Sequence, residues 1–334
     1  MATAPQGSAV YWTAWFLEIL SYCAVNCFGL ISGFVMVDKS IKIKSIVFLW
    51  MQIIFYSILI SVIVFILFPE SRTTGNLISS FLPIIRKQWW YASSYFGLYF
   101  LIPILNAAIN NITKQTHQKI LLSVLLGIGC IDCIISSNDP FSLNAGYSTA
   151  WLILLYLFGA YIKKYEIHKK ITAIKSILGF FAMIVFTFAS KAVIQALTQK
   201  ILGQPKAENT FISYISITVL LSAIFLFFFC LNVKTGNFAL KITCFLSPVT
   251  FGVYLIHVHP LIFNFVFKDA FSFLVYKPLP VMILGVLLAV AVIFVLCTVI
   301  ELMRIQLFKL MRISKLSEYI SQKLNNVYLT LFKK

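Results

Sequence analysis

The sequence contains the apolar run VMILGVLLAVAVIFVLCTVI, from Val281 to Ile300, with the acidic Glu301 directly after it. A helix of about 20 apolar residues is long enough to cross the hydrocarbon core of a bilayer, so this run predicts a transmembrane helix. Apolar runs of similar length recur from Trp15 onward. Counted by length and apolar content, they predict nine spans, at about residues 14–36, 45–68, 89–109, 119–136, 149–162, 174–197, 211–231, 243–265 and 281–302.

The composition also indicates a membrane protein. The chain is 60% hydrophobic and 11% charged, with a mean hydropathy of +0.94, whereas soluble domains usually carry about 25% charged residues. No loop between the predicted spans is long enough to fold as a soluble domain. We therefore predict an all-α, polytopic transmembrane helix bundle over residues 1–302, followed by a basic amphipathic cytoplasmic tail over residues 303–334.

The net charge of +17 does not indicate nucleic-acid binding, because the basic residues lie in short clusters between apolar runs and not on one face of a soluble fold. Most of the 27 Lys and Arg residues fall on one side of the membrane if the amino terminus is outside. The positive-inside rule therefore predicts an external amino terminus and a cytoplasmic carboxyl terminus. The Ile-, Lys- and Phe-rich composition is typical of a bacterium of low genomic GC content, so we expect a bacterial plasma membrane.

The first predicted span has a polar stripe. Glu18, Tyr22, Asn26, Gly29 and Gly33 share one face of a helix at 100° per residue. The GxxxG spacing of the two glycines permits close helix contact. The stripe is either a substrate-facing surface with an intramembrane carboxylate or a packing face with an interhelical Asn hydrogen bond.

The third predicted span opens with aromatic residues. Trp89 and Trp90 are typical of the aromatic belt at a membrane interface. Tyr91, Tyr95 and Tyr99 recur at a spacing of four residues, so they line one face of a helix. That face is either a sugar-binding wall or a packing surface.

The eighth predicted span carries histidines. Ser247, Thr250, Tyr254 and His257 fall on one face of a helix, whereas His259 falls on the opposite side, so the two histidines cannot chelate one metal from a regular helix. His257 is the candidate general base. The other interpretation is a hydrogen-bonded core histidine.

Two cysteines, one aspartate and one lysine within the predicted spans have simpler interpretations. Cys130 and Cys133 form a CxxC pair without a second pair or a histidine motif, so we predict no metal site. Asp132 and Lys191 lie near the outer ends of their predicted spans, and we expect their side chains to extend toward water.

Four segments, in order, resemble the acyltransferase-3 family of integral membrane acyltransferases. They are Ala24–Phe34, which ends in ISGF, Trp90–Pro103, Tyr147–Tyr161, and Phe251–His257, which reads FGVYLIH. Each segment alone is weakly specific, but four in sequence order are fairly specific. Within these segments, Ser32, Gly33, Trp90, Tyr254 and His257 match the family's motif positions.

The resemblance implies transfer of an acyl group, usually acetyl from cytoplasmic acetyl-coenzyme A, to a hydroxyl of a surface or lipid-linked glycan. It implies no tightly bound cofactor and a site in contact with membrane lipid. We predict His257 as the catalytic base. The predicted substrate-binding residues are Glu18, Asn26, Ser32, Trp90, Tyr95, Tyr99 and Tyr254.

The chain departs from the family at its amino end. Members of the family normally open with a further span that carries an arginine and then a histidine taken to be catalytic, but nothing before Trp12 offers that pair and no histidine precedes His117. We therefore expect either a shortened gene product or a start site placed too late. Two other functions stay open, an inactive family member and a transporter or flippase of a lipid-linked glycan.

Overall fold

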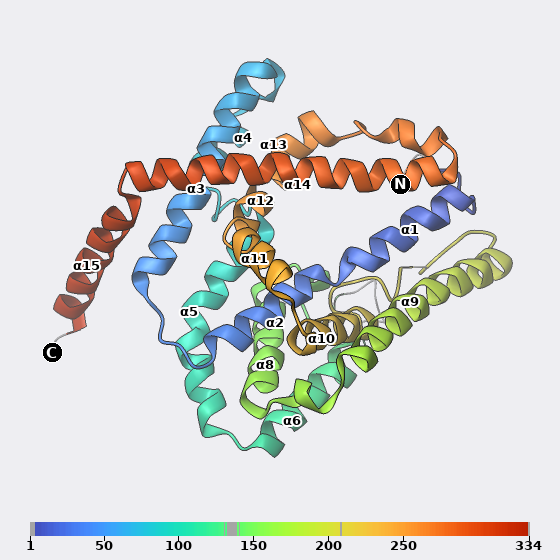
Figure 1. The fold of residues 1–334 in the computed structure, drawn as a ribbon, viewed down its shortest axis with the longest axis horizontal. Helices are drawn as coiled ribbons and strands as arrows, with labels where there is room; N and C mark the ends of the chain where they lie inside the picture. The colour runs from blue at the N-terminus through green and yellow to red at the C-terminus, as the bar shows by residue number, and fades with distance from the viewer. Residues whose placement is uncertain (1–3, 130, 132–138, 140, 208, 333–334) are drawn as a thin grey trace. The chain divides into compact units, whose positions relative to one another are not determined.

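The computed structural model describes residues 4–129, 131, 139, 141–207 and 209–332, and every regular element within these ranges is a helix (Figure 1). The all-α prediction is confirmed for these residues. The chain divides into two compact units: the first is Met1–Ser40 with Ser94–Lys234, and the second is Ile41–Ser93 with Thr235–Lys334. Helix α5 (Trp90–Asn111) begins in the second unit and continues in the first.

Five helical segments of the described chain are long and apolar enough to cross a membrane. They are Ala9–Met36, which comprises α1 and α2, then α3 (Ile43–Leu67), α5, α9 (Ala173–Leu202) and α14 (Leu279–Leu310). A sixth is added if α11 (Asn237–Leu246) and α12 (Thr250–His257), which are bent by 50° at their junction, form one span. The protein is therefore a polytopic membrane protein.

The other predicted spans correspond to shorter helices. The fifth is α8 (Thr149–Tyr165), which extends into the basic flank, and the seventh is α10 (Ile217–Asn232). The fourth begins in α6 (Lys114–Ser123) and a π-helical turn (Val124–Ile128), and most of its remainder, with Cys130, Asp132 and Cys133, lies outside the described residues. The total of nine spans stays a prediction.

The first unit is built around close contact of α2 (Ala24–Met36) with α8 (Figure 1). A Cβ atom at Gly33 would overlap the carbonyl oxygen of Tyr156, and one at Gly159 would overlap that of Leu30. Glycine is required at both positions because the two backbones touch. This contact confirms the packing predicted from the GxxxG spacing.

Four helices of the first unit begin at side-chain caps. Ser8 caps α1 (Ala9–Tyr22), and Thr113, Ser148 and Thr172 cap α6, α8 and α9, each by accepting a backbone N–H with its hydroxyl oxygen. Such a hydroxyl satisfies one of the N–H groups that a helix start leaves without a partner. Helix α9 packs on α10, and 3₁₀ turns lie at Asn144–Gly146 and Ile167–Lys170.

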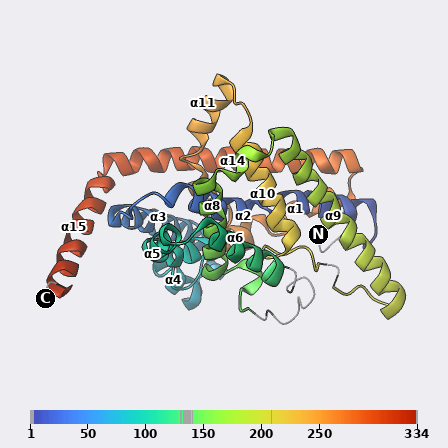
Figure 2. The same ribbon diagram turned by 90° about the horizontal axis from the view of Figure 1, so that it is seen from below.

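The second unit contains α3, α11, α12 and α14 together with several further elements. These are Pro69–Ser71, α4 (Thr74–Phe81), α13 (Pro260–Ile262), a π-helical turn (Phe263–Phe267), Ser272–Tyr276 and α15 (Ile313–Phe332). Figures 1 and 2 both show α14 running straight and α15 turning away at its end. Helix α15 packs on α3 and is tied to it by the exposed ion pair between Lys44 and Glu318, at 2.9 Å.

Candidate functional site

Helix α12 carries the FGVYLIH motif and is only eight residues long. It is separated from α11 by Ser247–Val249 and ends at His257, just before Pro260 begins α13. Proline lacks an N–H group and cannot continue the helical hydrogen bonds, so Pro248 and Pro260 break the helix on both sides. The prediction that Ser247 shares a helix face with His257 is therefore wrong.

His257 is half-buried at the carboxyl end of α12. Its Nδ1 lies 2.7 Å from the carbonyl oxygen of Val253. A carbonyl oxygen only accepts, so Nδ1 carries the proton and donates it, which leaves the lone pair of Nε2 able to take up a proton. This tautomer is the one that a general base requires, and the catalytic role of His257 stays a prediction.

Tyr254 lies one turn before His257, with the two ring centroids 6.4 Å apart. Its hydroxyl is buried, faces the backbone N–H groups of Tyr91 and Ala92, and donates to no described residue. Burying an O–H group without an acceptor is unfavourable, so this hydroxyl is a candidate hydrogen-bond donor to a bound substrate. The same ring packs on Tyr91, at 6.1 Å between centroids, and Tyr91 in turn packs on Trp90, which is half-buried.

His259 has a different environment from His257. It is fully buried, and its Nδ1 accepts the backbone N–H of Leu261 at 3.1 Å, so the neutral ring carries its proton on Nε2. The Gln88 amide lies 2.6 Å from that Nε2 and 2.7 Å from the Ser57 hydroxyl. The consistent arrangement has the amide oxygen accepting from His259 and the amide nitrogen donating to Ser57. Both nitrogens of His259 are therefore engaged, and this histidine is structural.

Trp89 does not belong to an aromatic belt, and that prediction is wrong. The residue is only 1% exposed, and its indole N–H donates to the carbonyl oxygen of Leu255 at 3.0 Å. Its ring also packs edge-on against His259, at 5.0 Å between centroids. Trp89 therefore holds the middle of α12 in place from within the second unit.

A buried charged cluster also lies against α12. The Glu301 carboxylate accepts from Tyr56 Oη at 2.5 Å and from Gln52 Nε2 at 3.1 Å. Arg304 donates to both carboxylate oxygens, from Nη2 at 2.5 Å and from Nε at 3.1 Å. A Cβ at Gly252 would overlap this carboxylate, so α12 rests directly on it.

Sequence reasoning missed this cluster. The available signal was a glutamate at the end of the most apolar run with an arginine three residues later, a spacing that brings two side chains together on a helix. Tyr56 and Gln52 gave no such signal because they lie in the interior of α3, more than 240 residues earlier in the chain.

The other predicted substrate-binding residues lie in the first unit. Asn26 is fully buried, donates to the carbonyl oxygen of Tyr214 at 2.8 Å and accepts the indole N–H of Trp151 at 3.0 Å. Its oxygen and nitrogen are therefore already engaged, which supports the interpretation as a packing residue. Ser32 donates to the carbonyl oxygen of Phe28 within its own helix, at 2.9 Å.

Glu18 is half-buried on α1. Lys191 of α9 packs against the same helix. Its ammonium lies 3.8 Å from the ring centroid of Trp15 and 2.9 Å from Asn209 Oδ1. Lys191 is fully buried, so the expectation that it extends toward water is wrong. An ammonium against an indole face gains a cation–π interaction that offsets part of its lost hydration.

Tyr95 and Tyr99 pack on each other, with ring centroids 6.3 Å apart. Tyr99 is 5% exposed and Tyr95 is half-buried. Gly97 between them lies against Thr149 of α8. The contact between the two rings favours a packing surface over an open sugar-binding wall. The role of Tyr95 and Tyr99 in substrate binding stays a prediction.

The model of the acyltransferase-3 family, which describes an acyltransferase domain, matches residues 2–298 of the chain. The protein belongs to the acyltransferase-3 family. The match includes His257 and all seven predicted substrate-binding residues, whereas Glu301 and Arg304 lie just beyond it. Comparison with curated proteins and with solved structures finds no match.

Membership of the acyltransferase-3 family establishes a membrane acyltransferase in general terms. Within the part of the chain that the structure describes, no group of three His, Cys, Asp or Glu residues is placed to hold a metal ion. Helix α12 of this acyltransferase-3 domain carries a histidine whose Nε2 has no partner among the described residues and a tyrosine hydroxyl that donates to none of them.

Proposed function

We propose that the protein is an O-acyltransferase of a bacterial plasma membrane that moves an acetyl group from acetyl-coenzyme A to a hydroxyl of a cell-surface or lipid-linked glycan. The observation that carries the proposal is the pairing of His257, whose Nδ1–H is bound to Val253, with the buried hydroxyl of Tyr254 one turn away. Family membership supports the acyl-transfer class.

The proposed reaction uses His257 as a general base. Its Nε2 takes the proton of the glycan hydroxyl, and the glycan oxygen attacks the thioester carbonyl carbon. The tetrahedral oxyanion that forms accepts a hydrogen bond from Tyr254. The C–S bond then breaks, the thiolate of coenzyme A takes the proton from His257, and the acetyl ester and free coenzyme A leave.

The test is the O-acetyl content of surface glycan in a deletion strain complemented with this chain. We expect the chain to restore alkali-labile O-acetyl ester, and His257→Ala to abolish it. His168→Gln, which changes a histidine of the first unit, is the matched control and should restore the ester in full. If His257→Ala restores the ester as well as the unmodified chain does, then His257 is not the base.

The second candidate is a transporter or flippase of a lipid-linked glycan. The break between α11 and α12, with its bend of 50°, favours it, because transporters often build their sites at discontinuous helices. Glycan translocation without any ester formation in the same strain would support this candidate. A third outcome, glycan and acetyl-coenzyme A binding without ester formation or transport, would indicate an inactive family member.

A further inference from the structure

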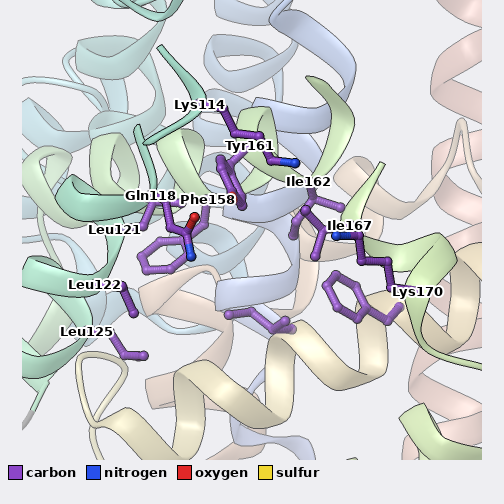
Figure 3. Close-up of a pocket in the computed structure, with 12 residues that line it drawn as sticks. Lys114, Gln118, Leu121, Leu122, Leu125, Phe158, Tyr161, Ile162, Ile167 and Lys170 are labelled. Carbon is purple, nitrogen blue, oxygen red and sulfur yellow. The ribbon is translucent and has the colours of Figure 1, made fainter. Parts of the chain in front are cut away.

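The first unit contains a pocket of about 420 Å³ between α6, α8, α10 and the turn Ile167–Lys170. Its volume lies within the range of about 300–1,000 Å³ that is usual for ligand sites. The proposed acyl-transfer chemistry uses none of its lining residues. Figure 3 shows the Lys114 and Lys170 nitrogens toward one end of the view and Leu122 and Leu125 toward the other. The pocket is therefore amphipathic.

The two lysines supply positive charge that the described residues do not neutralise. Lys170 forms no ion pair with any described residue, and Lys114 only faces the ring of Tyr165, with its ammonium 5.4 Å from the centroid. Glu166, the acidic residue closest in sequence to Lys170, is paired with Lys169 at 2.5 Å. That hydrogen bond lowers the pKa of Glu166, so its negative charge is already balanced by a different lysine.

The apolar part of the pocket is in reach of the bilayer. Leu122 on α6 is 46% exposed, while Phe158 of α8 and Phe228 of α10 form a buried wall. The positive-inside prediction places Lys114 and Lys170 on the cytoplasmic side. Basic pockets between membrane helices on that side are typical binding sites for anionic lipid headgroups, and the cytoplasmic leaflet is where such lipids carry their negative surface potential.

We propose that this pocket binds one anionic phospholipid, with its phosphate on Lys114 and Lys170 and an acyl chain along Leu122, Leu125 and Phe228. Two ammonium groups and one neutral amide, Gln118, match a single phosphodiester. The pocket offers few groups for the several phosphates and the adenine of coenzyme A, so a membrane phospholipid fits its chemistry better than the acyl donor does.

The experiment is native mass spectrometry of the full-length protein in detergent, titrated with phosphatidylglycerol and separately with phosphatidylcholine. We expect tighter binding of phosphatidylglycerol. A lysine near a lipid headgroup typically strengthens binding about fivefold, so the double variant Lys114→Gln, Lys170→Gln should weaken it by about 25-fold. Lys119→Gln, an exposed lysine on α6 outside the pocket, is the matched control and should change it by less than about twofold.

Four results would overturn the proposal. The first two are equal binding of the two lipids, and equal loss of lipid binding in the double variant and the control. The third is that inorganic phosphate competes as effectively as phosphatidylglycerol. The fourth is that palmitoyl-coenzyme A binds in a way that depends on Lys114 and Lys170 while phosphatidylglycerol does not bind. Leu125→Trp, which fills the apolar end, should also weaken lipid binding while the protein stays folded. Because the readout is lipid binding, it is independent of whether acetyl transfer occurs.

Discussion

Single hydrogen bonds distinguish the two histidines of the HxH sequence. The Nδ1 of His257 faces a carbonyl oxygen, whereas the Nδ1 of His259 faces an N–H group. The two rings therefore hold opposite tautomers. Only His257 keeps a free lone pair on Nε2, so the local backbone and not the sequence pattern determines which histidine can act as a base.

Tyr254→Phe removes the buried hydroxyl and separates its catalytic role from a structural one. We expect kcat for acetyl transfer to fall by about 100-fold, as for loss of one oxyanion donor. The apparent Tm should change little, because the hydroxyl donates to no described residue. Acetyl transfer to a purified glycan acceptor and thermal unfolding in detergent measure the two effects. Unchanged kcat would remove Tyr254 from the mechanism.

Arg304→Met tests the buried charge cluster. The substitution leaves the Glu301 carboxylate buried without its cation, which should destabilise the fold by about 3–5 kcal/mol. Lys309→Met, at an exposed position on the same helix, serves as the control and should shift the apparent Tm little. A Tm for Arg304→Met equal to that of the control would mean that the ion pair does not stabilise the second unit.

At the scale of elements, α2 and α8 touch through their backbones, and α12 is held by one indole hydrogen bond and by a buried charged cluster. The first contact depends on Gly33 and Gly159. The position of α12 depends on Trp89, which donates to the Leu255 carbonyl, and on Glu301, which lies against Gly252. Short helix α12 thus owes its position to neighbouring helices, since eight residues form a marginal helix alone.

Gly33→Ala should weaken the α2–α8 contact. Its Cβ would overlap the Tyr156 carbonyl, so the helices must separate, at a cost of about 1–3 kcal/mol. Gly127→Ala is the matched control because, apart from its own stretch of backbone, no described atom lies within 4 Å of its Cβ position. The apparent Tm in detergent reports both variants. Equal Tm values would show that α2 and α8 are not packed this closely.

At the scale of the whole molecule, the distribution of lysine and arginine predicts the orientation in the membrane. An external amino terminus and a cytoplasmic carboxyl terminus follow from the positive-inside rule. A phosphatase reporter that is active only outside the cytoplasm should be inactive when it is fused after Lys334. The same reporter should be active when it is fused at about residue 72, in a loop that is predicted to lie outside. The reverse pattern of activity would invert the predicted topology.

The sequence by itself determined the helical class, the membrane location, the close contact at the GxxxG glycines and the family. These features depend on apolar length, helical period and short motifs, all of which are local along the chain. Only the tertiary structure decided that Trp89 and Lys191 are buried, that Asn26 is a packing residue and that α12 rests on Glu301. The physical reason is that a buried polar group takes its partner from wherever the fold supplies one, as Glu301 does from Tyr56, 245 residues away.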